Sequence, residues 1–247
     1  MKLIQSLERG FDILELLSGE PERAFPLGEI AQAVGLHPAT CSHLLGTLVD
    51  RGYVESAGAR KGYRFGSMSH YLVRNKPFGG NLALLAEPLL EAVSARLGEW
   101  VVLTAMAGIR RLVLLELNSS PQAVQLDRRA LRLAEGAYDS ASVWLFMAFD
   151  DPSVFARFQA LNGLPADCAD PLARLAQVRE DGFCIYEDRA AGVAKVAFPI
   201  WQDNKVAAAV GVHLPAFRFA GGHRQAVMDS LAELAVQLGT GTGRSRA

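Results

Sequence analysis

Residues 27–46, Leu-Gly-Glu-Ile-Ala-Gln-Ala-Val-Gly-Leu-His-Pro-Ala-Thr-Cys-Ser-His-Leu-Leu-Gly, decide the fold of the first third of this chain. Apolar residues recur where two short helices have to pack together, at Ile30, Val34, Leu36, Cys41 and Leu44. Gly35 suits a turn that needs a positive φ. We expect one helix over 27–34 and another from Pro38, a favoured first-turn residue, to just before Gly52. Two short helices joined in this way form a helix-turn-helix.

The helix that begins at Pro38 has two unlike faces. One is an apolar stripe of Cys41, Leu44, Leu45 and Leu48, so Cys41 is expected in the core rather than as a redox sensor. The other carries small and hydrogen-bonding side chains, which can approach base edges and phosphates in a major groove. The candidate DNA contacts here are Pro38, Ala39, Thr40, Ser42, His43 and Thr47, followed by Arg51. His43 could equally be a plain surface residue.

The segments before and after the helix-turn-helix are predicted to complete a small domain. Upstream, Ser6 is expected to cap a helix that carries Leu7, Phe11, Leu14 and Leu17 at helical spacing. Downstream, residues 53–55 and 60–65 flank a turn-rich segment, which predicts a two-stranded hairpin, the wing. Arg60, Lys61 and Arg64 lie at or near its tip, where they could contact phosphates or the minor groove.

The charge supports DNA binding only locally. The 247 residues have a formal net charge of −1, so overall electrostatics do not indicate a nucleic-acid-binding protein. Residues 37–75, however, carry five Lys or Arg against two Asp or Glu. The basic residues therefore follow the proposed contact surface, and non-specific affinity should be weak and sensitive to salt.

Composition excludes several other classes of protein. Half of the residues are hydrophobic, which permits packed cores and argues against disorder. The three cysteines have no Cys-x-x-Cys spacing, so neither a disulfide framework nor a zinc cluster is indicated, and a reducing cytoplasm fits. We find no signal peptide and no apolar run near the ~20 residues of a membrane span.

Catalytic motifs are also missing. The sequence has no Gly-x-Ser-x-Gly, His-Glu-x-x-His, Walker loop or Gly-x-Gly-x-x-Gly, and its five histidines lack metal-ligand spacing. We therefore expect neither an enzyme nor a cofactor. The alternative to a DNA-binding regulator is a winged-helix adaptor that binds protein and not DNA.

These residues resemble the IclR family of bacterial transcriptional regulators. In the N-terminal part the resemblance is carried by Ser6–Gly10, Ile13–Leu17, Glu29–Ala31, Gly35–Leu36, Thr40, Leu44–Val54 and Tyr63–Gly66. It continues more weakly through Glu87–Leu90, Gly182–Phe183, Gly192–Val193 and Ala197–Ile200. The resemblance implies a winged helix-turn-helix, a GAF-like effector domain, dimers or tetramers, and control of catabolic operons by small organic molecules. Members of the family include repressors and activators.

The chain departs from the family pattern in both parts. The family usually has a Lys or similar polar residue in place of Pro38 and an Arg in place of His43, so two cationic contacts to the operator are lost. A His-Ala-Thr-Ala-x-Gly-Lys segment is common where this chain has residues 138–144, and a Cys is common where it has Lys195. These departures indicate specialised effector chemistry, so a ligand typical of the family is not assumed.

We expect residues 1–73 to form the winged helix-turn-helix, 74–81 a linker, 82–239 the GAF-like effector-binding domain and 240–247 a flexible tail. The fold class of the second domain is α+β, a mostly antiparallel sheet flanked by helices. Strands are expected over 100–106, 111–117, 123–128, 183–187, 193–200 and 206–214, the last two joined by a turn at 202–205. Helices are expected over 82–97, 140–149, 153–161, 171–181 and 223–238.

The candidate effector site lies at the start of the helix near residue 140. Free N–H groups and the positive end of the helix dipole favour a carboxylate or phosphate there. Ser140 and Ser142 add hydroxyls, Tyr138 adds a wall, and Lys195 is a cationic partner if it faces the same cavity. The other candidates are Asp139, which would need a ligand hydroxyl or amine, and the apolar Trp100, Met106 and Trp144.

Plainer alternatives stay open for these residues. Asp139 and Ser140 could merely cap their helix, Lys195 could point to solvent, and Trp144 and Met106 could belong to the core. A small organic effector, carboxylate or aromatic, is thus a hypothesis. The expected partners are double-stranded operator DNA, this effector and further copies of the chain as a homodimer or tetramer, in the cytoplasm and on the nucleoid when bound.

Overall fold

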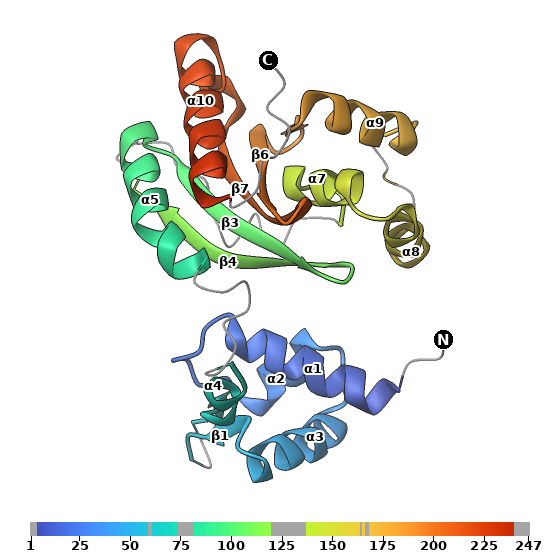
Figure 1. Ribbon diagram of the computed structural model, residues 1–247. Helices are drawn as coiled ribbons and strands as arrows, with labels where there is room; N and C mark the ends of the chain where they lie inside the picture. The colour runs from blue at the N-terminus through green and yellow to red at the C-terminus, as the bar shows by residue number, and fades with distance from the viewer. Residues whose placement is uncertain are drawn as a thin grey trace. The chain divides into compact units, whose positions relative to one another are not determined.

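The computed structural model describes residues 4–58, 61–73, 82–119, 137–163, 165 and 168–239. The chain forms two compact units, Met1–Gly80 and Asn81–Ala247 (Figure 1). The expected linker over 74–81, the strand over 123–128 and the tail over 240–247 lie outside the described residues.

The N-terminal unit is the expected winged helix-turn-helix. Its elements are α1 (Gln5–Ser18), α2 (Leu27–Ala33), α3 (Pro38–Asp50), β1 (Val54–Ser56), β2 (Tyr63–Phe65) and α4 (Met68–Val73). Ile13 and Leu17 of α1, Ile30 of α2, and Cys41 and Leu45 of α3 are fully buried together. The apolar spacing that predicts the helices therefore also supplies the core that holds them.

The expected cap at Ser6 is wrong. Helix α1 begins two residues earlier than that cap implies, at Gln5, with Ile4 at the N-cap position and no side-chain hydrogen bond there. Ile4 offers only its carbonyl, which accepts the N–H groups of Leu7 and Glu8. Residues 4–7 are exposed, so water can satisfy the first-turn N–H groups and a side-chain cap is not required.

The wing is attached to the segment between α1 and α2 by main-chain contacts. Tyr63 at the start of β2 exchanges two backbone hydrogen bonds with Phe25, of 2.8 and 2.9 Å. Gly62 makes this approach possible, because a Cβ there would lie 2.2 Å from the Phe25 carbonyl oxygen and its φ is +95°. The wing thus has a fixed position on the unit.

The C-terminal unit contains a five-stranded antiparallel sheet in the order β4-β3-β7-β6-β5. The strands are β3 (Trp100–Ala107), β4 (Arg110–Asn118), β5 (Cys184–Asp188), β6 (Val193–Gln202) and β7 (Lys205–Pro215). Strands β6 and β7 are joined at Asp203 and Asn204, both with positive φ, as a tight type I′ hairpin turn requires. The expected antiparallel α+β fold is confirmed.

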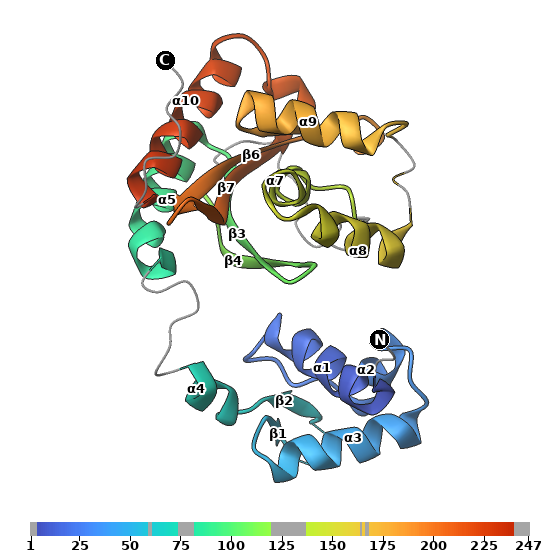
Figure 2. The ribbon, with the colours of Figure 1, turned by 45° about the vertical axis from the view of Figure 1, so that its right-hand side comes forward.

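Helices cover both faces of this sheet (Figures 1 and 2). Helices α5 (Leu82–Leu97) and α10 (Gly221–Leu238) pack on one face. Helix α7 (Ala141–Phe149) lies on the other, with α8 (Pro152–Asn162) and α9 (Pro171–Asp181) packed against it. All residues of α7 except the half-buried Phe149 are buried. No described helix is long and apolar enough to cross a membrane.

A buried ionic cluster joins α10 to the start of β3. Glu99 is 2% exposed and pairs with Arg218, which belongs to the 3₁₀ turn Ala216–Arg218. The second carboxylate oxygen of Glu99 lies 2.9 Å from Nε2 of His223, in the first turn of α10. The Ser94 hydroxyl of α5 donates to the Glu99 carbonyl at 2.8 Å. One buried residue thus connects three elements on this side of the sheet.

Candidate functional site

Helix α3 has the two faces that the sequence predicts. Cys41 and Leu45 are fully buried, and Leu44 and Leu48 are half-buried. All six candidate DNA contacts on the helix are exposed: Pro38, Ala39, Thr40, Ser42, His43 and Thr47. Thr47 donates its hydroxyl hydrogen to the His43 carbonyl at 3.2 Å, so it can offer DNA its methyl group and an acceptor oxygen.

The start of α3 is capped by His37, which the sequence argument does not single out. Its Nδ1 accepts the N–H of Ala39 at 3.3 Å, and Pro38 occupies the first helical position. An accepting Nδ1 assigns the proton of the neutral ring to Nε2, which leaves an N–H donor beside the helix N-terminus. The signal is the Pro itself, because the residue before a first-turn proline is the N-cap.

The basic residues near α3 do not form one unopposed cluster. Arg51 at the C-cap of α3 and Lys61 at the wing are exposed and have no ion pair with described residues. Arg64 instead donates from two nitrogens to one Glu55 carboxylate oxygen across the wing, at 3.0 and 3.2 Å. Arg60 lies outside the described residues. A phosphate would therefore compete with Glu55 for Arg64.

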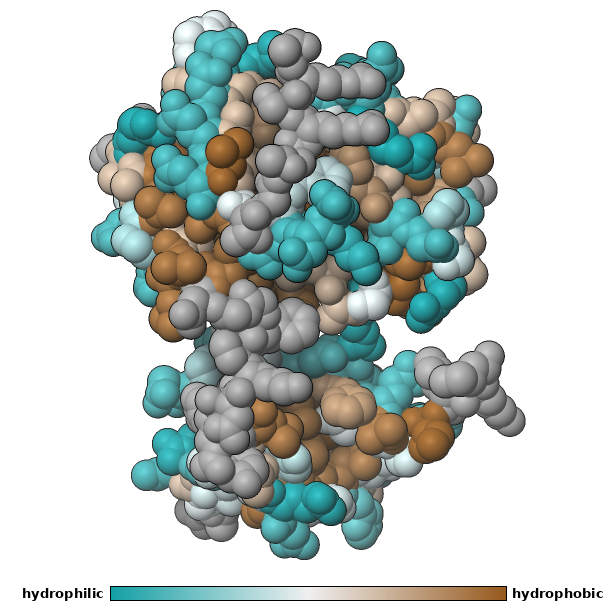
Figure 3. Space-filling view, viewed as in Figure 1, coloured by the Kyte–Doolittle hydropathy of each residue, from teal (hydrophilic) through white to brown (hydrophobic). Residues whose placement is uncertain are grey.

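A large apolar groove of about 1040 Å³ runs between α1, α3 and α4 in the same unit. Leu7 and Phe11 of α1 are 56% and 51% exposed on it, and Leu72 of α4 is 62% exposed. Figure 3 shows hydrophobic side chains gathered on this unit. Exposed apolar side chains gathered around one groove make it a candidate binding face.

In the C-terminal unit, the candidate residue Lys195 lies inside the protein. It is 1% exposed, on the sheet face that α7 covers, so the alternative in which it points to solvent does not hold. Its Nζ donates to the carbonyl oxygen of Asp139 at 2.5 Å, just before α7 begins. The structure thus brings together the cation and the helix start that the sequence singles out.

The side chains at the start of α7 interact with one another and with the sheet. Ser140 occupies the N-cap position, but its hydroxyl lies 2.9 Å from the hydroxyl of Ser142 and makes no capping bond. Asp139 accepts a hydrogen bond of 3.0 Å from the Tyr186 hydroxyl of β5. Both serines are buried. Simple capping therefore does not account for Ser140.

The aromatic candidates are mostly core residues. Tyr138 donates its hydroxyl to the Gly163 carbonyl at 2.7 Å, and burial raises its pKa. Trp144 is 1% exposed and donates to the Tyr138 carbonyl at 2.9 Å. Met106 is half-buried at the edge of the same cluster, and Trp100 is buried in β3. Tyr138 and Trp144 therefore belong to the core that supports the start of α7.

His213 of β7 lies opposite Lys195 in the sheet, and it is not among the residues predicted from the sequence. Cross-strand pairing places Tyr186, Lys195, His213 and Trp100 in one row across four strands. The His213 ring meets Trp100 edge-on at 4.8 Å, and Nδ1 has no hydrogen-bond partner among the described residues. Burial first, then the positive charges of Lys195 and Arg111, hold its pKa well below the usual 6.5. The ring is therefore neutral and surrounded by positive charge.

Arg174 of α9 lies beside these residues and is also absent from the residues predicted from the sequence. Its guanidinium lies over the rings of Trp144 and Tyr186, at 4.4 and 5.2 Å. Burial raises the pKa of the Cys184 thiol to about 11, although the positive charge of Arg174 opposes this shift. Cys184 is thus an unreactive core thiol.

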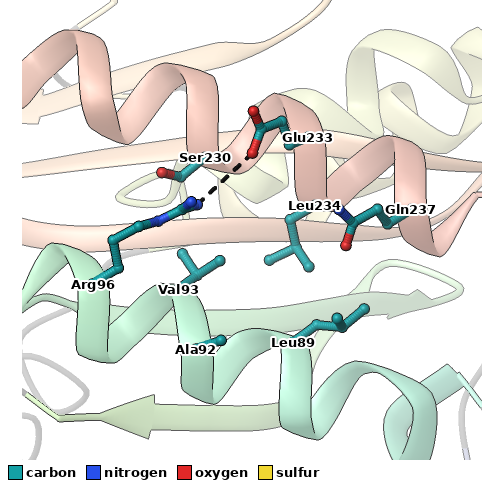
Figure 4. A pocket seen from close by; sticks show the side chains of 8 residues that line it. All are labelled: Leu89, Ala92, Val93, Arg96, Ser230, Glu233, Leu234 and Gln237. Atoms are coloured by element: carbon teal, nitrogen blue, oxygen red, sulfur yellow. Dashed lines mark ion pairs between the residues drawn. The ribbon is translucent and has the colours of Figure 1, made fainter.

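The groove between α5 and α10 is separate from this site (Figure 4). It has a volume of about 230 Å³ on the opposite face of the sheet, and Arg96 and Glu233 pair across it at 3.9 Å. None of the effector candidates lines it. Among the described residues, no three His, Cys, Asp or Glu side chains are arranged to hold a metal ion.

A winged helix-turn-helix with an exposed α3, followed by an α+β domain with a buried polar site, is the architecture of a ligand-responsive transcription factor. Residues 6–58 match the IclR helix-turn-helix domain model and residues 79–240 match the model of the bacterial transcriptional regulator IclR C-terminal domain. The chain belongs to the IclR family. It is a DNA-binding transcriptional regulator with an effector-binding C-terminal domain, and not an enzyme.

Curated relatives agree along most of the chain. It is 27% identical to the HTH-type transcriptional regulator XynR of Escherichia coli K12, over 86% of each chain. It is also 27% identical to the DNA-binding transcriptional repressor YiaJ of the same strain, over 94% of this chain and 85% of YiaJ. These relatives favour the regulator over the protein-binding adaptor.

Solved structures share the fold. An IclR transcriptional regulator from Alicyclobacillus acidocaldarius superimposes with a TM-score of 0.67 at 24% identity, over 96% of this chain and 98% of that one. An IclR homolog from Microbacterium hydrocarbonoxydans, complexed with 4-hydroxybenzoate, gives a TM-score of 0.69 at 22% identity, over 94% and 98% of the two chains.

Proposed function

We propose that the exposed face of α3 enters the major groove of an operator half-site while the wing contacts the adjacent backbone. The observation that carries this is the burial of Cys41 and Leu45, which turns the opposite face outward. The proposed contacts are Pro38, Ala39, Thr40, Ser42, His43, Thr47, Arg51, Arg60, Lys61 and Arg64. The protein acts in the cytoplasm, on the nucleoid when bound to DNA.

A gel shift with the DNA upstream of the protein's own gene, at two salt concentrations, tests this assignment. Lys61→Gln removes one phosphate contact, so we expect weaker binding and a salt slope smaller by about 0.9. Arg189→Gln, an exposed arginine of the C-terminal unit, is the matched control and should leave both unchanged. No shift with any DNA would favour the adaptor instead.

The C-terminal unit senses a small organic carboxylate at the start of α7. A buried Lys195 directed at that helix start is the observation that carries this proposal. A carboxylate could accept from Lys195, from the Ser140 and Ser142 hydroxyls and from His213 in its Nδ1-protonated form, and Trp100 and Tyr186 flank this row with aromatic surface. The Microbacterium homolog's 4-hydroxybenzoate is a ligand of this chemistry. Asp139 and Met106 complete the proposed site.

Calorimetric titration of aromatic and aliphatic acids, 4-hydroxybenzoate among them, tests the site. Lys195→Met keeps the length and apolar stem of the side chain but removes the charge, so we expect at least a tenfold loss of affinity. Lys205→Met changes an exposed lysine at the β6–β7 turn and should bind as the wild type does. Equal affinity in Lys195→Met and wild type would remove Lys195 from the site.

The active species is a homodimer, or a tetramer built from dimers, in which a second copy packs on Leu7 and Phe11 at the α1 side of the groove and leaves Thr47 and Arg51 of α3, which also line it, to DNA. The support is the exposure of Leu7 and Phe11 on that groove, and the small DNA surface that one winged helix buries alone. Sedimentation of Phe11→Ser should show dissociation, whereas Phe217→Ser, at a phenylalanine of the other unit that is even more exposed, should sediment as the wild type does. An unchanged Phe11→Ser oligomer would rule the groove out as the interface.

A further inference from the structure

The outermost line of α3 is made of small and neutral residues over most of its length and ends at the acidic Asp50. Ala39, His43 and Gly46 follow one another at helical spacing on the side opposite the buried Cys41 and Leu45, and all three are exposed. This line is what a base edge would meet first. Its chemistry therefore limits which bases α3 can recognise.

Gly46 has no structural reason within the free protein. It lies in the interior of a thirteen-residue helix, where glycine is less stable than alanine. A Cβ built on it meets nothing within 4 Å, and its φ is not positive. Neither packing nor backbone conformation requires the missing side chain. In the placement proposed above, it is DNA that approaches this face.

The side chains that pair with guanine or adenine in two-bond contacts are missing from this face. Such contacts use Arg or Lys for guanine and Asn or Gln for adenine, and α3, which is described throughout, contains none of these four. What it offers instead are methyl groups on Ala39, Thr40 and Thr47, the His43 ring, and the Ser42 hydroxyl, which does not select one base. Methyl groups of Ala and Thr contact the 5-methyl group of thymine.

We propose that α3 approaches the base edges closely at Gly46 and recognises thymine methyl groups through Ala39 and Thr40, so that the centre of each operator half-site is rich in A·T pairs. This rests on the placement of α3 in the major groove proposed above. The Thr47 hydroxyl, already bonded to the His43 carbonyl, leaves its methyl group for the same use.

Selection of bound sequences from a random DNA library, followed by replacement of single dT by dU in the selected site, tests the recognition of methyl groups. The replacement removes one methyl group and leaves base pairing intact. We expect at least one position where the full-length wild type loses about fourfold in affinity, the effect of one buried methyl. Thr40→Ser keeps the hydroxyl but removes the methyl group of the protein. At the position that Thr40 contacts, we expect this variant to bind the dT site more weakly than the wild type does, and to lose no further affinity when dT is replaced by dU. A G·C-rich core, or dU replacements without effect, would overturn the proposal.

Gly46→Ala tests the close approach with two opposite readouts. Thermal unfolding of the N-terminal unit should shift upward, because alanine favours the helix, while affinity for the selected site falls at least tenfold. Gly222→Ala, in the first turn of α10 with equally open surroundings, should leave binding unchanged. Wild-type affinity in Gly46→Ala would refute the close approach. Failure to select any sequence would refute the placement of α3 on DNA itself, so the two failures are distinguishable.

Discussion

Replacing Gly62 by alanine should detach the wing from the rest of the N-terminal unit. The new Cβ would lie 2.2 Å from the Phe25 carbonyl oxygen and 2.5 Å from its carbonyl carbon. Both are backbone atoms, so no side-chain rotation relieves the contact. The wing has to move, and the hydrogen bonds between Phe25 and Tyr63 break. Gly58→Ala is the matched control, because Gly58 also has a positive φ, +108°, but open space around its Cβ.

The magnitude divides into two parts. Both variants place a residue with a Cβ at positive φ, which costs roughly 1–3 kcal/mol. Only Gly62→Ala also loses two backbone hydrogen bonds, at about 0.5–1.5 kcal/mol each. The free energy of unfolding of the N-terminal unit should therefore fall by about 1–3 kcal/mol more in Gly62→Ala than in Gly58→Ala.

The distribution of tryptophans makes the assay specific. All three, Trp100, Trp144 and Trp201, belong to the C-terminal unit. Urea unfolding followed by tryptophan fluorescence should thus be the same in both variants and wild type. Far-UV circular dichroism, which reports helices of both units, should show an earlier transition in Gly62→Ala, and Phe25 and Tyr63 amides should exchange faster. Equal destabilisation by the two variants would refute the reasoning.

Three further outcomes follow from other contacts. Because the pKa of His213 lies well below 6.5 in the folded state, the unfolded chain protonates first, and stability should fall below about pH 6.5 by up to about 1.4 kcal/mol per pH unit. Urea unfolding at a series of pH values should show that the free energy of unfolding of His213→Gln depends less on pH below 6.5 than that of the wild type. An equal pH dependence in the two proteins would contradict the assignment to His213. Glu99→Gln should cost about 3 kcal/mol by tryptophan fluorescence, because Arg218 loses its buried partner; a loss below 1 kcal/mol would mean that the pair adds little. His37→Ala should lower the thermal midpoint of the N-terminal unit through loss of the α3 cap, worth about 0.5–1 kcal/mol, and His37→Asn should restore it; the idea fails if Asn does not.

Local signals in the sequence predict α3 well. Pro38 starts the helix, Gly52 follows its end, and the spacing of Cys41 and Leu45 fixes its buried side; each acts over a turn or two of chain. The prediction of a cap at Ser6 is wrong because it rests on one weak local preference, whereas several signals agree for α3. A capping residue is a preference of about 1 kcal/mol, and solvent can replace it at an exposed helix end.

The composition of the proposed effector site depends on a feature that the sequence does not reveal. With the turn at Asp203 and Asn204, a regular hairpin would pair Lys195 with Val212. The bulge between Ile200 and Trp201 shifts the register by one residue and places His213 opposite Lys195 instead. A one-residue shift moves every later side chain of a strand to the other face. His213 could therefore not be assigned to the site from spacing alone.

The burial of α7 limits how a signal could leave the site at its start. Eight of its nine residues, Ala141–Ala148, are buried between the sheet and the helices packed around it. Such a helix cannot slide or turn by itself, because any displacement would open voids or expose apolar side chains to water. A ligand that pushes on Ser140 must move α7, α8 and α9 together as one block. The sensor would then respond by a rigid-body movement of these three helices between two stable positions, rather than by local unfolding of one segment.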